Sequence, residues 1–378
     1  MNDPVKNLKM WVAVFLALTA LLAFVLFRAS RVVVHRPWPL APGEAERLGL
    51  SEPLAASLAL ASLAPSSHNT QPWKVRLLSD REVSVLLDEE RLLPAVDPER
   101  REALVSVGAF LENLVQGAAV MGLKAEVEPT IDDPAGIEVA RVRFEPANGN
   151  GKTRILEAIL ARDTFRGPLP ADALPDETVQ ALTGTAPSRW AFFPPGSPEG
   201  DWIREALAES NQVQASRDDA MEELAAWIRF SPGAVARHRD GLTTSGMGLP
   251  APVRAFMALL FNEKSVTGKA FREAGTKKAR EQAEACAGFF VLESPDGSPR
   301  SAVQAGRDLE SFWLEAVLRG VAVHPMSQVL EESPWKEQAA SRLGVAGTVQ
   351  MVLRVGLAPV APRPVSPRRP LEAFVERP

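Results

Sequence analysis

A dense set of neutral polar side chains lies between two prolines, in the segment that spans residues 64–73. It reads APSSHNTQPW and follows a run rich in alanine and leucine. Hydroxyl and amide groups both donate and accept hydrogen bonds, so they suit the edge of a flat heteroaromatic ligand with alternating acceptors and an N–H. A polar turn that caps two elements explains the same residues equally well.

Two arginines four residues apart provide a second candidate feature. Arg162 and Arg166 flank Thr164 at the end of a predicted helix over residues 153–162. Guanidinium groups are permanently charged forks of donors, and with a hydroxyl between them they suit a dianionic phosphate. Taken alone, the pattern fits a surface charge cluster better than a phosphate site.

The composition excludes several other kinds of site. The 378 residues are 46% apolar and 24% charged, which is ordinary for a globular protein and rules out wholesale disorder. A net charge of -5 leaves no basic excess for nucleic acid. The single cysteine, Cys286, excludes an internal disulfide and a cysteine-based metal site, and the four scattered histidines form no HExxH pair. We therefore expect no metal and no nucleic-acid partner.

An apolar run near the N-terminus, Met10–Phe27, is predicted to lie outside the fold. It holds no charged residue and, at about 1.5 Å per residue, extends roughly 27 Å, close to the hydrocarbon thickness of a bilayer. No small-residue cleavage site follows it, so we expect an uncleaved single-pass anchor rather than a signal peptide. Two lysines precede the run and three arginines follow it, which favours a cytoplasmic location for the rest of the chain.

The elements that must position the polar residues follow one another without regular β–α–β winding, which indicates an α+β protein. The longest predicted helix, over residues 97–121, repeats apolar residues at three- and four-residue steps after a capping Asp97. We expect strands at 74–78, 82–88, 124–129, 137–144, 189–193, 289–293 and 348–356, and further helices at 54–63, 153–162, 201–214, 218–230, 252–261, 270–286, 301–320 and 335–343.

The segment at residues 64–73 closely resembles the flavin-binding motif Pro-Ser-x-x-Asn-x-Gln-Pro-Trp of the nitroreductase superfamily. Residues 162–166 (RDTFR) resemble that family's Arg-x-Ser/Thr-x-Arg segment, which holds the FMN phosphate from the partner subunit of a dimer. Residues 366–370 (SPRRP) resemble its C-terminal basic element, and residues 321–328 its loop behind the isoalloxazine ring. The resemblance implies a cofactor site composed of Pro65, Ser66, Ser67, Asn69, Gln71, Arg162, Thr164, Arg166, His324, Pro325, Met326, Gln328, Arg368 and Arg369.

The resemblance runs from about Ser51 to the C-terminus and is closest to the two-lobed Acg-like branch, in which one chain carries two nitroreductase-like halves. It implies an α+β, nitroreductase-like fold built as a single-chain pseudo-dimer, to which the apolar run at Met10–Phe27 adds an N-terminal transmembrane helix. The expected parts are an anchor with its flank (1–36), a first lobe (37–150) and a second lobe (151–378) with a lid-like insertion at about 195–268.

A proline-rich linker at residues 36–43 and a polar break at 147–151 separate these expected parts. Residues 185–190 (TAPSRW) look like a relic of the motif at 64–73 that has lost its polar middle. The first half then retains the polar motif at 64–73 and lacks the arginine pair, and the second half retains the arginine pair at 162–166 and lacks the polar motif. One chain should therefore hold one site, and a monomer suffices.

The function that the resemblance implies is an FMN-dependent oxidoreductase. It would pass hydride from NADH or NADPH through FMN to a nitroaromatic, a quinone or a similar small-molecule acceptor. Flavin performs this chemistry without a side-chain acid or base, so no catalytic residue is named. The alternative is a protein that stores or sequesters FMN with little or no turnover. Residues 231–252 hold four glycines and would be either a lid over the site or a solvated loop.

Overall fold

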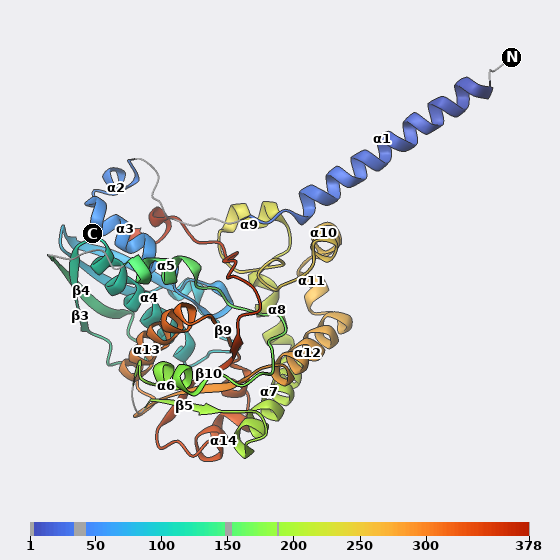
Figure 1. Ribbon diagram of the computed structural model, residues 1–378. Coiled ribbons are helices and arrows are strands. Elements are labelled where there is room, and N and C mark those ends of the chain that lie inside the picture. Colours follow the sequence, from blue (N-terminus) through green and yellow to red (C-terminus); the bar gives the residue numbers. More distant parts are fainter. Residues whose placement is uncertain (1–3, 34–42, 148–152, 187–188, 378) are drawn as a thin grey trace.

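A computed structural model of the chain describes residues 4–33, 43–147, 153–186 and 189–377. Two larger β-sheets, a two-stranded sheet of β6 and β7, and a set of helices form one body among the described residues, from which the N-terminal helix projects (Figure 1). Most of the predicted linker at 36–43, most of the polar break at 147–151 and part of the segment at 185–190 lie outside the described residues.

The first sheet combines the N-terminal half of the chain with its last residues. Its strand order is β11-β1-β2-β4-β3. Strands β1 and β2 form the predicted hairpin, with Val75 opposite Val85, because alternate residues of β1 are apolar and buried. The C-terminal strand β11 adds to β1 in parallel. The bounds are β1 Trp73–Ser79, β2 Glu82–Leu87, β3 Leu123–Pro129, β4 Glu138–Pro146 and β11 Val375–Glu376.

The second sheet is antiparallel throughout and has the order β5-β8-β10-β9. Its strand β10 is buried along nearly its whole length, which explains a sequence that is apolar on both faces. One charged residue, Arg354, lies within that run and is fully buried. The bounds are β5 Trp190–Phe193, β8 Gly288–Ser294, β9 Val321–Pro325 and β10 Thr348–Leu357.

Two long helices join the sheets at the centre of the body. Helix α4 (Arg101–Val120) packs on the first sheet and α13 (Pro299–Leu318) on the second, and the two helices lie side by side (Figure 1). Their backbones meet at Gly108 and Gly306, where a Cβ on either residue would collide with a carbonyl oxygen of the opposite helix. Glycine at both positions therefore permits the close approach.

The remaining elements surround this centre. Helices and short strands between β5 and β8 form a layer with its own apolar cluster around Met221, Phe230 and Met257. The bounds are α2 Glu44–Arg47, α3 Glu52–Ala61, α5 Thr153–Ala161, α6 Asp176–Thr183, α7 Pro198–Ser216, α8 Asp218–Trp227, β6 Ile228–Arg229, α9 Pro232–His238, β7 Leu242–Thr243, α10 Ala251–Leu260, α11 Glu263–Val266, α12 Lys269–Glu284 and α14 Trp335–Arg342. Short 3-10 helices occupy Ser67–Asn69, Glu89–Arg91, Gln328–Leu330 and Leu371–Ala373.

Two sequence-based expectations about local structure are wrong. The helix expected from Asp97 begins at Arg101, because Arg100 takes a left-handed conformation (φ 61°). Asp97 still caps the helix, since its carboxylate accepts the N–H of Ala103 at 2.9 Å. Residues 231–252, expected as a loop, contain α9 and β7.

The N-terminal helix α1 (Pro4–Ser30) stands away from the body (Figure 1). Its residues Trp11–Ser30 have a mean hydropathy of 2.4 and a length sufficient to cross a membrane, and their side chains are not buried. Helix α4 has a similar composition but lies mostly inside the body. The predicted apolar run is thus a helix outside the core.

Candidate functional site

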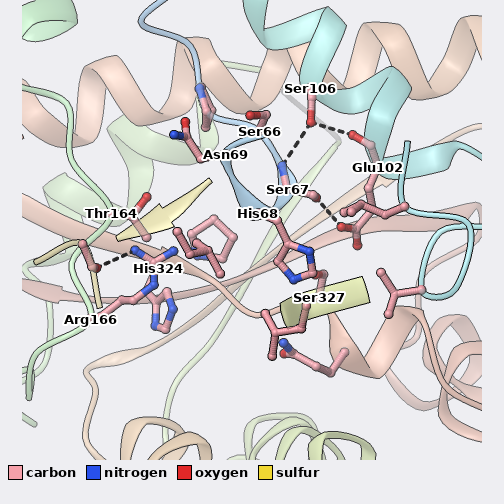
Figure 2. A pocket seen from close by; sticks show the side chains of 18 of the residues that line it. Ser66, Ser67, His68, Asn69, Glu102, Ser106, Thr164, Arg166, His324 and Ser327 are labelled. Carbon is pink, nitrogen blue, oxygen red and sulfur yellow. Dashed lines mark hydrogen bonds between the residues drawn. The ribbon is translucent and has the colours of Figure 1, made fainter. Parts of the chain in front are cut away.

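A cavity of about 330 Å³ lies where the motif at residues 64–73 faces the segment at 162–166. In Figure 2, Thr164, Arg166 and His324 lie to one side of it, and Ser67, Glu102 and Ser106 to the other. The predicted cofactor residues that line the cavity are Pro65, Ser66, Ser67, Asn69, Arg162, Thr164, Arg166, His324, Pro325, Gln328 and Arg368.

The motif loop adopts an unusual backbone. His68, Asn69 and Gln71 all have positive φ angles, of 48°, 55° and 55°. Such conformations are unfavourable for residues with a Cβ and persist where surrounding contacts hold them. The hydroxyl of Ser66 accepts the N–H of Gln71 at 3.0 Å, and Ser67 bonds through its backbone to Ser106 and through its hydroxyl to Glu102. The loop is therefore rigid and directs its polar groups in a fixed way.

The C-terminal basic element, residues 366–370, holds this loop in place through hydrogen bonds. The amide nitrogen of Asn69 donates to Gly241 O and Pro367 O, at 3.1 and 3.2 Å, and its oxygen accepts from Arg368 at 2.9 Å. Arg368 also donates to the carbonyl oxygens of Leu63 and Ala64. Segments almost three hundred residues apart in the chain thus meet at Asn69.

Arg162 is tied to the protein at the inner end of the cavity. Its Nε lies 3.2 Å from the carboxylate of Glu310, its Nη2 donates to Leu63 O, and its guanidinium stacks 4.9 Å above the ring of Trp313. Glu310 is fully buried, and burial raises its pKa to about 7 although Arg162 opposes the shift. Glu310 is therefore only partly ionised near neutral pH.

Arg166 differs from Arg162 because no carboxylate of the described residues forms an ion pair with it. It donates one hydrogen bond, to Gly246 O at 2.9 Å, and burial lowers its pKa. Buried Arg354 fixes the backbone around it by donating to Phe165 O and Gly167 O, at 3.2 and 2.8 Å. Thr164 pairs with Val323 at the edge of the second sheet. The segment is held in place while the charge of Arg166 remains available to an anion.

Three predicted cofactor residues do not line the cavity. Gln71 is fully buried and bonds to Arg239 O and to the N–H of Arg369. Arg369 pairs with Asp88 at 3.3 Å and donates to Gln71 O and Trp73 O. Met326 packs in the apolar cluster beneath the second sheet. These side chains make their contacts inside the protein and support the loops that border the cavity.

Two histidines at the cavity are held neutral. Burial lowers the pKa of His68 to about 4, with Glu102 opposing and Arg166 assisting the shift. Burial and nearby Arg166 also lower the pKa of His324 well below its usual value. The Nδ1 atom of each lacks a hydrogen-bond partner within the described part of the chain. Both rings can therefore offer a neutral donor or acceptor to a ligand.

Two acidic residues, Glu102 and Glu331, border the cavity, and no sequence pattern singled them out. Burial and neighbouring Glu102 raise the pKa of Glu331 well above its usual value. Burial acts on Glu102 too, but Arg101, 2.8 Å away, and the hydroxyl of Ser67 outweigh it and lower the pKa. Burial and the neighbouring carboxylate therefore favour the protonated form of Glu331 beside Glu102. The signal that could have drawn attention to Glu102 is a carboxylate on the apolar face of a predicted helix.

The chain is similar along most of its length to several bacterial proteins. It is 28% identical over 335 residues to a Mycobacterium tuberculosis protein named "Putative NAD(P)H nitroreductase acg", an alignment that covers 84% of this chain and 94% of that protein. It is 26% identical over 339 residues to Rv3131, which has the same nitroreductase designation in that organism, with 87% and 92% covered. No family model matches the chain.

Solved structures resemble the chain more distantly. The FMN-dependent nitroreductase NfnB of Mycobacterium smegmatis, in complex with NADPH, is 18% identical, with a TM-score of 0.39, and covers 59% of this chain and 97% of its own. A nitroreductase-like protein of Bacillus cereus is 13% identical, with a TM-score of 0.31, and covers 59% and 94%. The similarity to these relatives over most of the chain agrees with the resemblance of the motif at residues 64–73 to the nitroreductase superfamily and supports a place near its Acg-like proteins.

Proposed function

We propose that the chain is a membrane-anchored, FMN-dependent oxidoreductase that uses NADH or NADPH to reduce a small acceptor such as a nitroaromatic or a quinone. One observation carries this proposal. The Pro-Ser-Ser-His-Asn loop and the Arg-Asp-Thr-Phe-Arg segment, about a hundred residues apart in sequence, face each other across the cavity. The relatives named NAD(P)H nitroreductases support the choice of cofactor and electron donor.

The residues present fit a phosphate-bearing, flat heteroaromatic ligand. Arg166 forms no close ion pair among the described residues, although Asp163 lies near enough to act on its charge, and it would hold the phosphate together with the hydroxyl of Thr164. Arg162 would attract the phosphate less strongly, because the carboxylate of Glu310 already lies 3.2 Å from its Nε. Ser66 and Ser67 would meet the ring and ribityl chain from the motif loop, and His324 with Pro325 and Gln328 would back the ring.

The chemistry of such a site belongs to the cofactor, which when bound accepts a hydride from the reduced nicotinamide and passes two electrons to the acceptor. The residues of the chain would bind and orient the cofactor and restrict access to it. Neutral His68 and His324 keep further positive charge away from the cavity, and protonated Glu331 keeps a proton close to it.

We also propose that the two lobes form a pseudo-dimer within one chain. Each sheet carries one long helix, and the helices meet face to face at Gly108 and Gly306, as equivalent elements of a symmetric pair would. The motif loop and the arginine segment come from opposite sides of the expected lobe boundary at residue 151, so one chain would hold one FMN as a monomer. The division at residue 151 needs one amendment, since β11 returns to the first sheet.

Helix α1 would anchor the protein in a membrane. Its length and its unburied apolar surface support this role, and the basic residues that follow it favour a body in the cytoplasm. An uncleaved anchor accounts for a helix that continues without a break to Ser30 beside the body.

FMN storage is the second candidate, and a specific observation favours it. Gly241, in the segment expected as a lid, bonds to Asn69 in both directions, through its N–H and its carbonyl oxygen. Asp240 next to it pairs with Arg91 and Arg229, at 2.8 Å each. A segment held this firmly over the motif loop would restrict the entry of a nicotinamide.

The absorbance of the purified, full-length protein separates these functions. Under anaerobic conditions, NADH or NADPH should bleach the flavin band, and an added nitroaromatic or quinone should restore it. Bound flavin that neither cofactor bleaches, although dithionite does, would establish storage instead. A protein purified without flavin, which added FMN does not bind, would contradict both proposals.

A further inference from the structure

Helix α10 carries the main apolar surface that the body leaves uncovered. Val253, Phe256, Leu259 and Leu260 are 41%, 53%, 50% and 64% exposed. They recur at three- and four-residue steps, so they form one face of the helix. Ala255 and Met257 point inward and are buried, which attaches α10 to the body. Large exposed apolar residues elsewhere in the described body are scattered along the chain, which is normal for a globular protein.

This apolar face lies where the N-terminal helix meets the body. Figure 1 shows α10 next to the end of α1 from which the chain enters the body. Arg254 of α10 donates two hydrogen bonds to Ser30 O, at 3.0 and 3.2 Å, and a third to Leu249 O. A cation at the C-terminal end of α1 is also favourable for the helix dipole. The position of α10 relative to α1 is therefore fixed by specific contacts.

Exposed basic residues surround the same region. Arg28 and Arg31 lie at the end of α1, Arg237 lies on α9, which also contacts α1, and Lys264 lies on α11. One exposed acidic residue, Glu263, is next to Lys264. Apolar side chains with arginine and lysine on neighbouring elements are typical of helices that lie in the interface of a membrane with anionic headgroups.

We propose that α10 is an interfacial helix, whose face of Val253, Phe256, Leu259 and Leu260 inserts into the surface of the lipid bilayer that α1 crosses. The inference rests on the proposed anchoring by α1. Covering by a second copy of the chain is less favourable, since four half-exposed side chains fall short of the roughly 800 Å² that each partner of a standard interface contributes. The segment that carries α10 also supplies Leu242, Thr243 and Gly246 to the cavity wall. Insertion would hold that wall of the cavity close to the membrane.

Spin labels on the full-length protein in vesicles of phosphatidylcholine and phosphatidylglycerol test this proposal. In a Cys286→Ala background, single cysteines are introduced as Phe256→Cys and Leu260→Cys on α10, and as Leu18→Cys in the middle of α1. Ser341→Cys, at an exposed position on α14, is the matched control on the body. The measurement is the accessibility of each label to oxygen, which partitions into lipid, relative to a water-soluble nickel chelate.

Labels at positions 256 and 260 should show a high ratio of oxygen to nickel accessibility, as the label at 18 does, whereas position 341 should be aqueous. Aqueous labels at 256 and 260 with a lipid-embedded label at 18 would overturn the inference and leave the anchor intact. An aqueous label at 18 would overturn both. Spin–spin broadening at 260 that disappears on dilution with unlabelled chains would show that a second copy covers the face, and would also overturn the inference.

Discussion

Replacement of Arg166 by methionine tests the phosphate site, because this change removes the charge and retains an apolar stem of similar length. Arg166 has one hydrogen bond, to Gly246 O, and no ion pair among the residues that the structure describes. Its charge-assisted contact with a phosphate is worth roughly 1.5–3 kcal/mol, so Arg166→Met should weaken FMN binding by about 10- to 150-fold. Fluorescence titration of the flavin-free protein with FMN gives the dissociation constant.

Two comparisons make this result specific. Riboflavin lacks the phosphate, so its affinity should barely change in Arg166→Met. Arg342→Met, which removes an exposed arginine from α14, should leave both affinities unchanged. Equal losses for FMN and riboflavin would mean that the substitution acts through the fold of the loop, and the assignment of Arg166 to the phosphate would be refuted.

Three further predictions concern packing, protonation and access. Gly306→Ala forces α13 away from α4 and should lower the free energy of unfolding by roughly 1–3 kcal/mol in urea titrations, whereas Gly275→Ala, which has open space around it in α12, should be neutral or slightly stabilising. Because the pKa of Glu310 is raised to about 7 in the folded protein, its contribution to stability is full below about pH 4.5 and is lost as the pH rises through 7. The loss amounts to about 3 kcal/mol, and an unfolding series in Glu310→Gln should lack this slope; an unchanged slope would contradict the assignment. Replacement of residues 231–252 by a short Gly/Ser linker should leave FMN bound and speed its reduction by NADPH in stopped-flow absorbance, and an unchanged rate with flavin retained would remove the lid.

Local patterns were sufficient to predict most of the elements. The hairpin of β1 and β2 and the long helices α4 and α13 follow from alternation and from three- and four-residue steps, which depend only on neighbouring residues. Strand β11 could not be predicted in this way, because it has two residues and forms only by pairing with β1, about three hundred positions earlier. The start of α4 was misplaced since the left-handed turn at Arg100 has no glycine to signal it.

The candidate site was predictable where a continuous motif carries it. The loop at 64–73 and the segment at 162–166 do line one cavity, as their resemblance to the family implies. Sequence alone could not distinguish Arg368, which reaches Asn69, from neighbouring Arg369, which is paired with Asp88 behind the loop. Which of two adjacent arginines faces a cavity depends on tertiary contacts, and the same holds for the buried pair of Glu102 and Glu331.

The most direct test of the central claim is native mass spectrometry of the full-length protein released from detergent micelles after incubation with FMN. The account predicts a monomer that carries one FMN, since a single chain supplies the motif loop, Arg162 and Arg166 to one cavity. A chain that carries two flavins, that binds FMN only as a dimer, or that remains flavin-free at saturating FMN would contradict the claim that two halves of this one chain assemble a single flavin site.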